Sequence, residues 1–272
     1  MESENLRVVS FLDKEVGAMK DPLFLSKTIK NQISYGDDLS ERPSIRMIDL
    51  MSGMSRLAEK PLDPIGKAIQ GAESAACVVY ARSTDPSATS QWTGSGFLLP
   101  GGLIVTANHV IEPTPQSSGD VSVEVSFDGQ TSYPAKMMGG DRDFDIAILK
   151  VPDDIPVRPV LLSNDPPIPG EIIATIGAPE GWANVVTVGR VSATNMTPSL
   201  PPDKSWTDMI FIDADILEGS SGSMVIDIKG QVIGSVMGII GRHAADAGRG
   251  HNAVVSIEKI KGVISSILEN VV

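Results

Sequence analysis

The chain has 272 residues, of which 42% are hydrophobic, and it carries a formal net charge of −12. This composition excludes a disordered chain, and no repeat period that would indicate a solenoid is visible. Most of the negative charge follows residue 70, where 12 Lys and Arg stand against 23 Asp and Glu. Such acidity argues against nucleic-acid binding; it suits a solvated surface and, to a lesser degree, a cationic peptide or partner.

The N-terminal sequence and the single cysteine bear on the compartment. The first residues lack the basic and apolar stretches of a secretory signal, and no segment approaches the roughly 18 consecutive apolar residues of a membrane span. We therefore expect a cytoplasmic protein that does not enter a membrane. The single cysteine, Cys77, lies in the apolar run 75–81 and is expected to be a small buried hydrophobic residue.

The first 70 residues are predicted to be helical. Apolar residues recur at helical spacing in three segments before residue 61, and the third carries a methionine-rich face. That face is suited to docking a partner, although packing against the chain's own body is the commoner use. Asp63 and Pro64 then open a short helix that ends at Ile69. We predict a helical N-terminal extension over residues 1–70 with a regulatory or partner-docking role.

From Ala75 on, short β-branched runs alternate with Gly, Pro, Asn and Asp, which is typical of many antiparallel strands. Twelve strands in about 180 residues are too many for one small sandwich and suit two packed barrels. Ser256 is predicted to cap a C-terminal helix with one apolar face. The predicted strands are 77–82, 95–99, 103–106, 121–127, 135–138, 146–151, 172–176, 185–193, 210–213, 224–227, 232–237 and 253–255.

A run of small residues, Gly219-Ser-Ser-Gly-Ser223, lies between two apolar segments and predicts a tight bend. Glycines let the backbone approach a ligand closely, so the amides of Gly219 and Ser221 can converge on a developing oxyanion while Ser221 presents its hydroxyl. Taken alone, these five residues fit an ordinary turn better than a catalytic loop.

Serine chemistry also needs a base within hydrogen-bond reach of the hydroxyl. Of the three histidines, His243 and His251 lie in a glycine-rich stretch, where a solvated imidazole is expected. His109 instead follows directly on the apolar strand 102–106 and a two-residue turn. A single histidine at a strand end is commonly structural, so His109 becomes a candidate base only together with a partner acid.

The candidate acid is Asp145, which abuts the apolar strand that begins at Ile146. A barrel would partly bury this carboxylate, whereas Asp141 and Asp143 of the same turn should face water. A buried carboxylate without a partner is costly, and an imidazole is a natural partner for it.

These segments, in this order, resemble the trypsin-like serine peptidases, most closely the HtrA/Deg branch. The resemblance is carried by residues 94–110, 145–151 and 219–222, with further agreement at 169–179, 185–193 and 230–234. It covers about residues 74–265 and implies an all-β fold of two packed six-stranded antiparallel β-barrels, with the active site between them. We therefore assign residues 71–272 to a trypsin-like serine protease domain, with a helical extension before it and a helix at its end.

The resemblance also implies roles for individual residues. His109 would be the general base, Asp145 the acid that orients it and Ser221 the nucleophile, with the Gly219 and Ser221 amides as the oxyanion hole. Three features depart from the family. Gly222-Ser-Met replaces the usual Gly-Gly-Pro, Ser220 replaces the aspartate that digestive trypsins use in zymogen activation, and the PDZ domain of HtrA proteins is not expected here. Residues 1–70 are the candidate for regulation instead.

The resulting hypothesis is a serine endopeptidase that acts on protein or peptide substrates without a metal or cofactor. Asp215 lies six residues before Ser221, the offset at which trypsin closes its specificity pocket with an aspartate. This resemblance implies that a buried opposite charge could hold a substrate Lys or Arg, although HtrA-like chains commonly prefer small aliphatic side chains. A regulatory protein could dock on residues 1–70, and neither nucleic acid nor a membrane is expected as a partner. The alternative is a catalytically silent or gated protease-fold module that binds or signals.

Overall fold

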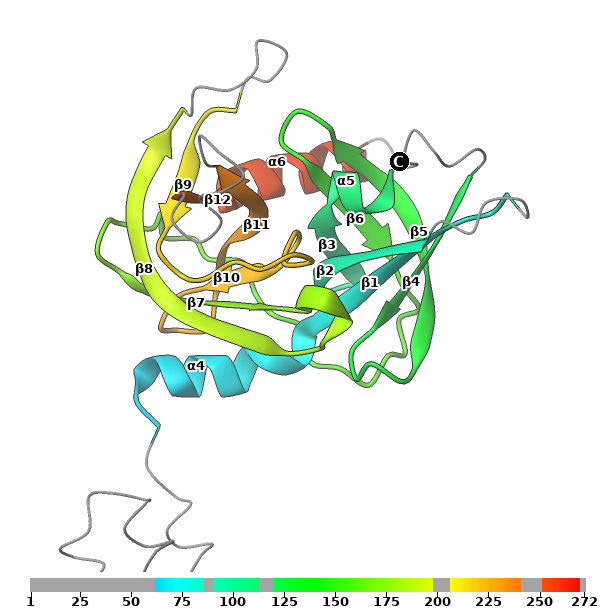
Figure 1. Cartoon of the computed structure of the whole chain (residues 1–272), viewed down its shortest axis with the longest axis horizontal. Coiled ribbons are helices and arrows are strands. Elements are labelled where there is room, and N and C mark those ends of the chain that lie inside the picture. Colours follow the sequence, from blue (N-terminus) through cyan, green and yellow to red (C-terminus); the bar gives the residue numbers. More distant parts are fainter. Residues whose placement is uncertain (1–61, 86–90, 113–119, 198–205, 241–250, 270–272) are drawn as a thin grey trace, which may run out of the picture. The chain divides into compact units, whose positions relative to one another are not determined.

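The computed structural model describes residues 62–85, 91–112, 120–197, 206–240 and 251–269 (Figure 1). The chain divides into two units, Met1–Lys60 and Pro61–Val272, and everything described belongs to the second. The three helical segments predicted before residue 61, with their methionine-rich face, lie outside the described residues. In the described part, no helix is both long enough and apolar enough to span a bilayer.

The first half of the described chain forms a closed antiparallel barrel. Its strands lie in the order β1-β2-β3-β6-β5-β4, so that β1 closes the barrel against β4. The strands are β1 (Ala76–Ser83), β2 (Gln91–Leu99), β3 (Leu103–Ala107), β4 (Val121–Ser126), β5 (Ser132–Asp141) and β6 (Ile146–Lys150).

The second half forms another closed antiparallel barrel beside the first (Figure 1). Its strand order is β10-β11-β12-β9-β8-β7. The prediction of two six-stranded antiparallel barrels is therefore confirmed, and each predicted strand coincides with an observed one. The strands are β7 (Ile172–Gly177), β8 (Val185–Met196), β9 (Met209–Ile212), β10 (Met224–Ile226), β11 (Val232–Ile240) and β12 (His251–Ser256).

Apolar side chains from both barrels meet in one continuous core. Phe97 and Ile148 of the first barrel belong to the same buried cluster as Ile176 and Met224 of the second, and all four are at most 1% exposed. Burial of each such side chain contributes about 1.5–3 kcal/mol, so this shared cluster contributes substantially to the stability of the fold. Cys77 is fully buried in this cluster, as predicted, and burial raises the pKa of its thiol.

Helix α4 (Pro64–Ala72) lies just before the first barrel in sequence and packs against β7 of the second. Asp63 Oδ1 accepts a hydrogen bond from the Gly66 amide at 2.8 Å, and Pro64 occupies the first turn, as predicted from the sequence. The helix buries Ile65, Ala68 and Ala72 in the main core. Residues 64–70, which the sequence assigns to the extension, thus share the core of the barrels.

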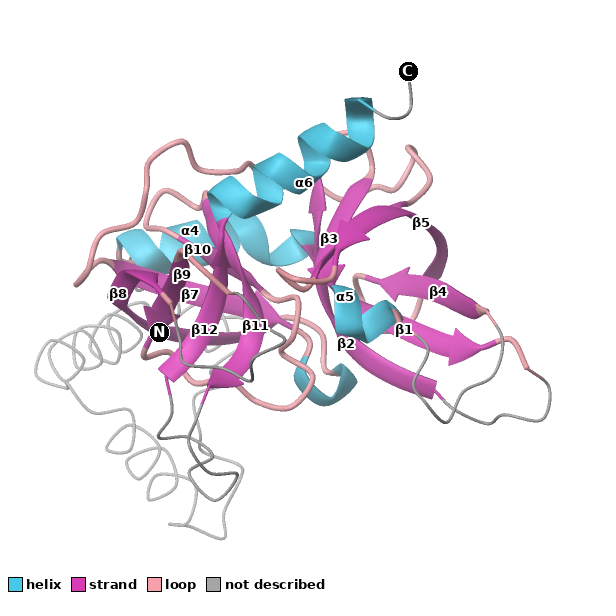
Figure 2. Ribbon diagram, turned by 90° about the horizontal axis from the view of Figure 1, so that it is seen from above, coloured by secondary structure: helices cyan, strands magenta, loops and turns pink. Residues whose placement is uncertain are grey.

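Helix α6 (Ile257–Glu269) confirms the predicted C-terminal helix and continues directly from β12. It packs against β11 and β12 of its own barrel and then crosses to β5 and β6 of the other barrel (Figure 2). Lys259 strengthens this crossing, because its Nζ lies 4.3 Å from the centroid of the Phe144 ring and 3.1 Å from Asp208 Oδ2. Helix α4, which precedes the first barrel in sequence, thus covers part of the second, and α6, which follows the second, covers part of the first.

Candidate active site

The candidate base lies on a short helix that follows β3 without a linker. Ala107 has extended dihedral angles, and α5 (Asn108–Ile111) begins at the next residue. The Asn108 amide donates to the Asp145 backbone carbonyl at 3.1 Å, which ties this helix to the turn before β6. The side chain of His109 is 52% exposed, so a substrate can reach it.

The candidate acid lies on the turn between β5 and β6. Asp141 Oδ1 shapes this turn by accepting hydrogen bonds from the amides of Asp143 and Phe144, at 2.8 and 3.0 Å. Asp145 has a φ of +56°, a left-handed conformation that few residues other than glycine adopt. As predicted, its side chain is partly buried, with 13% exposed, and Asp143 is exposed, whereas Asp141 is only partly so.

Asp145 and His109 form a two-point contact. His109 Nδ1 lies 2.6 Å from Asp145 Oδ2, and the His109 amide donates to Asp145 Oδ1 at 2.8 Å. A carboxylate can only accept hydrogen bonds, so Nδ1 carries the proton and Nε2 of the neutral imidazole is the basic nitrogen. Both oxygens of the carboxylate are thus used to fix the position and the tautomer of one histidine.

The candidate nucleophile lies on the loop between β9 and β10, which folds as two successive turns. The Ser220 amide donates to the Leu217 carbonyl at 3.0 Å, and the Leu217 amide donates to Ser220 Oγ at 3.1 Å. The Ser223 amide then donates to the Ser220 carbonyl at 2.9 Å. Ser220, which replaces the aspartate of digestive trypsins, therefore uses its hydroxyl to close its own turn.

The direction of the Gly219 amide follows from its peptide plane. Glu180, in the turn η3 (Pro179–Gly181), donates its amide to the Glu218 carbonyl at 3.1 Å. In a trans peptide the C=O and the following N–H point in opposite directions, so the Gly219 N–H points away from Glu180. Gly219 has a φ of +83°, and a Cβ there would lie 2.8 Å from the Glu180 nitrogen, so both the conformation and the space require glycine.

The Ser221 amide is oriented by the same rule, because the carbonyl of its peptide accepts from Ser223. In the part of the chain that the structure describes, neither this amide nor that of Gly219 donates to a protein acceptor. The Ser221 hydroxyl donates to the Met237 carbonyl at 3.2 Å, where a bulge in β11 takes Met237 out of the pairing with β12. Catalytic hydrogen bonds commonly form only when the substrate is bound, and a rotation about χ1 releases this hydroxyl.

The nucleophile loop lies against the strand that leads to the histidine. A Cβ on Gly222 would lie 2.9 Å from Thr106 Oγ1 and 3.0 Å from the Ala107 nitrogen, and Gly222 has a φ of +89°. Ser221 precedes Gly222 and His109 follows Ala107 by two residues. The structure thus brings His109 and Asp145 into direct contact and seats the loop of Ser221 on the same end of β3.

Asp215 lies on the approach to this loop. Its backbone carbonyl accepts a hydrogen bond from Thr187 Oγ1 of β8 at 2.8 Å, so the position of its backbone is fixed. The residue itself is exposed, while its neighbours Ala214 and Ile216 are buried. The carboxylate is therefore accessible to a cationic side chain, and it is exposed where the resemblance to trypsin implied a buried charge.

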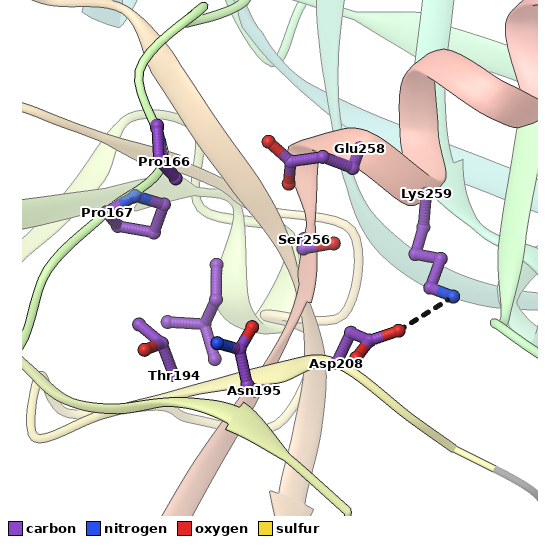
Figure 3. A pocket seen from close by; sticks show the side chains of 9 residues that line it. Pro166, Pro167, Thr194, Asn195, Asp208, Ser256, Glu258 and Lys259 are labelled. Atoms are coloured by element: carbon purple, nitrogen blue, oxygen red, sulfur yellow. Dashed lines mark ion pairs between the residues drawn. The ribbon is translucent and has the colours of Figure 1, made fainter.

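A separate hollow of about 540 Å³ opens on the second barrel, beside the start of α6 (Figure 3). Its charged side chains are Asp208 and Lys259, which pair with each other, and Glu258. None of the predicted site residues lines it; the lining consists of Pro166, Pro167, Thr194, Asn195, Asp208, Ile210, Ser256, Glu258 and Lys259. Across the described residues, no three His, Cys, Asp or Glu side chains gather as a metal-ligand set.

Three residues around the site were not predicted from the sequence: Ser95, Glu180 and Met237. Ser95 Oγ donates to the Gly219 carbonyl at 2.8 Å across a sequence separation of 124 residues. Glu180 and Met237 contribute backbone groups, which carry no signature in the side-chain sequence. Ser95 alone could have been noticed, because it lies between two glycines in the block 94–110.

Comparison with known proteins identifies the family of this chain. A profile of the trypsin-like peptidase domain matches residues 94–234. A DegP-like protein of Marinomonas sp., named a probable periplasmic serine endoprotease, is 36% identical over 143 residues, which are 52% of this chain and 28% of that protein. Serine protease HTRA3 of Homo sapiens is 34% identical over 145 residues, which are 52% of this chain and 32% of that protein. The match thus spans about a third of these relatives' length.

Solved structures show the same fold. The active form of a protease from M. tuberculosis is 25% identical and superimposes with a TM-score of 0.62, covering 74% of this chain and 83% of that one. The HtrA-type protease AlgW, determined with a tripeptide, is also 25% identical with a TM-score of 0.62, covering 75% of this chain and 63% of that one.

Proposed function

The chain belongs to the family of trypsin-like peptidases, with HtrA- and DegP-like relatives, and from that premise we propose that it is a serine endopeptidase acting on protein substrates. The observation that carries the proposal is the two-point contact of Asp145 with His109, at 2.6 and 2.8 Å. A carboxylate bonded to Nδ1 holds an exposed imidazole in the orientation and tautomer that a general base needs.

The mechanism proceeds through an acyl-enzyme. Ser221 Oγ attacks the carbon of the scissile carbonyl while His109 Nε2 takes the hydroxyl proton, and Asp145 stabilises the imidazolium that forms. The carbonyl oxygen becomes an oxyanion, which the amides of Gly219 and Ser221 bind. His109 then returns the proton to the leaving amine. Water repeats the sequence to release the acyl group and to restore Ser221.

The alternative function is a silent or gated module of the same fold, and one observation favours it: the Ser221 hydroxyl is bonded to the Met237 carbonyl. A fluorophosphonate probe separates the two, because it reacts only with an activated serine. We expect the full chain to be labelled at Ser221, as read by peptide mass spectrometry, and Ser163 to remain unlabelled. Absence of label from a folded chain would favour the silent module.

We also propose that Asp215 favours substrates with Lys or Arg before the cleaved bond, because it offers an exposed carboxylate six residues before Ser221. In a peptide library, Asp215→Asn should lower cleavage after Lys and Arg about two- to fivefold relative to other residues, as loss of an exposed charge partner does. Glu218→Gln, which removes an exposed charge from the same loop, is the control and should preserve the preference. A parent enzyme that shows no preference for Lys or Arg would refute the role of Asp215.

Regulation through residues 1–70 is a further part of the proposal. Two features of the segment support this role. Its charge is nearly neutral, with 10 Lys and Arg against 11 Asp and Glu, and it carries a methionine-rich face. The rate of fluorophosphonate labelling tests this regulation. If the segment is regulatory, we expect removal of residues 1–60 to change that rate. An unchanged rate together with unchanged partners in pull-downs would contradict the regulatory role.

The cytoplasmic location expected from the N-terminal sequence stays a prediction, while the relative from Marinomonas sp. is named periplasmic. Cell fractionation with compartment markers decides between the two, and recovery in a periplasmic fraction would contradict the cytoplasmic assignment. Substrates are expected to be proteins or peptides, with no role for nucleic acid or membrane binding.

A further inference from the structure

Ser95 is a fully buried residue of β2 that makes four hydrogen bonds around the nucleophile loop. Its hydroxyl accepts from the Ala178 amide at 2.8 Å and donates to the Gly219 carbonyl at 2.8 Å. Its own amide donates to the Ser221 carbonyl at 2.8 Å, and its carbonyl accepts from Thr106 Oγ1 at 2.7 Å. One residue of the first barrel thus contacts the loop of the second barrel on both sides of Ser220.

We propose that Ser95 is a positioning residue for the oxyanion hole: its hydroxyl fixes the peptide that follows Gly219, and so keeps the Gly219 N–H pointed at the substrate oxygen. The inference rests on the proposed peptidase function. Ser95 does not touch the reacting atoms, and acts through the backbone of Gly219.

Gly219 needs such an anchor because it has no side chain to restrict it. Glycine populates both signs of φ about equally, so the peptides on either side of Gly219 can rotate with little steric resistance. In the structure both are held by their carbonyls, that of Glu218 by the Glu180 amide and that of Gly219 by Ser95. Loss of either anchor would let the Gly219 N–H rotate away from the oxyanion.

The Ser95 hydroxyl also supports the second anchor. Its acceptor lone pair binds the Ala178 amide, and Ala178 immediately precedes η3, whose Glu180 holds the Glu218 carbonyl. The same hydroxyl therefore connects both anchors of Gly219. Removing the hydroxyl would leave the Ala178 amide and the Gly219 carbonyl without this hydrogen-bond partner in a buried place, which is costly. The peptide after Gly219 would rotate to find other partners for these groups.

The backbone of Ser95 keeps the hydroxyl in place. A Cβ on Gly222 would lie 2.0 Å from the Ser95 carbonyl oxygen, so the loop and β2 approach as closely as glycine permits. The Ser95 amide binds the Ser221 carbonyl directly. Substitution of the side chain should therefore change the hydroxyl contacts while the main-chain contacts between the two segments remain.

The test compares Ser95→Ala with Ser163→Ala. Ser163 is also fully buried, and its hydroxyl likewise accepts from an amide and donates to a carbonyl, both of Asp165 at 3.1 Å, but it lies on the connection between the barrels. We expect Ser95→Ala to lower kcat about 100-fold with KM changed less than about threefold, as for loss of one oxyanion donor. Ser163→Ala should lose similar thermal stability and keep its kcat.

A second readout separates positioning from stability. A peptide boronate, whose tetrahedral adduct resembles the transition state, should bind Ser95→Ala about 100-fold more weakly, while a product peptide should bind unchanged. If Ser95→Ala does not fold, Ser95→Cys preserves the shape with a weaker donor and should show an intermediate kcat. A kcat within about threefold of the parent in the folded variant would overturn the inference. An unlabelled, inactive parent would instead overturn the peptidase function itself.

Discussion

Replacing Ser221 with alanine is expected to lower kcat by roughly a million-fold and to leave the fold intact, since the nucleophile and its base act as a unit in serine peptidases. The structural cost should be small. Ser221 is partly exposed, and its hydroxyl donates only a long bond, 3.2 Å, to the Met237 carbonyl. Steady-state hydrolysis of a fluorogenic peptide measures the first effect, and thermal denaturation measures the second.

The control for this experiment is Ser163→Ala, which removes a buried hydroxyl far from the loop in sequence. It should hydrolyse the peptide at the rate of the parent. A Ser221→Ala variant that cleaves as well as the parent would show that the hydrolysis comes from another residue or from a contaminant, and the assignment of the nucleophile would fail.

The second large effect is expected for Asp145→Asn, which should lower kcat about 10⁴-fold, as the equivalent change does in a serine peptidase of this type. An asparagine has one oxygen where Asp145 uses two. Its oxygen can still accept from the His109 amide, but its NH₂ group then faces Nδ1. Nδ1 must become the acceptor, so the proton moves to Nε2, and the imidazole can no longer take the proton of Ser221.

The matched control is Asp143→Asn, which removes an exposed carboxylate from the same turn. The kcat of both variants is measured on one peptide substrate, and circular dichroism checks that both are folded. Equal activity of Asp145→Asn and Asp143→Asn would mean that the carboxylate of Asp145 serves the turn and not the histidine.

The strands were predictable because they depend on local signals: β-branched runs between turn residues mark all twelve. His109 after one apolar strand and Asp145 before another marked two candidate residues, and the resemblance to the trypsin-like peptidases supplied their pairing. The strand ends differ in both directions: the predicted strands 121–127, 146–151, 210–213 and 224–227 run one residue past the observed ends, and others stop short of them. β8, for example, runs to Met196 through two register shifts that no local pattern announces.

The surroundings of Ser221 were not predictable, since they depend on pairings between distant segments. The carbonyl of Met237 is available only because β11 bulges beside β12, and the role of Ser95 appears only when β2 meets the loop before β10. The turn expected before His109 is a short helix, α5, because the Asp145 carbonyl binds its first amide. Long-range contacts of this kind leave no periodicity in the sequence.

The two helices at the edges of the barrel unit have a consequence for how it unfolds. Each barrel is closed, so no strand edge joins one to the other. Helix α4, which precedes the first barrel, packs on β7 of the second, and α6, which follows the second, packs on β5 and β6 of the first. Separating the barrels would strip both helices from their apolar supports at once. The two barrels should therefore melt together in one calorimetric transition, as a single cooperative unit, rather than as two independent domains.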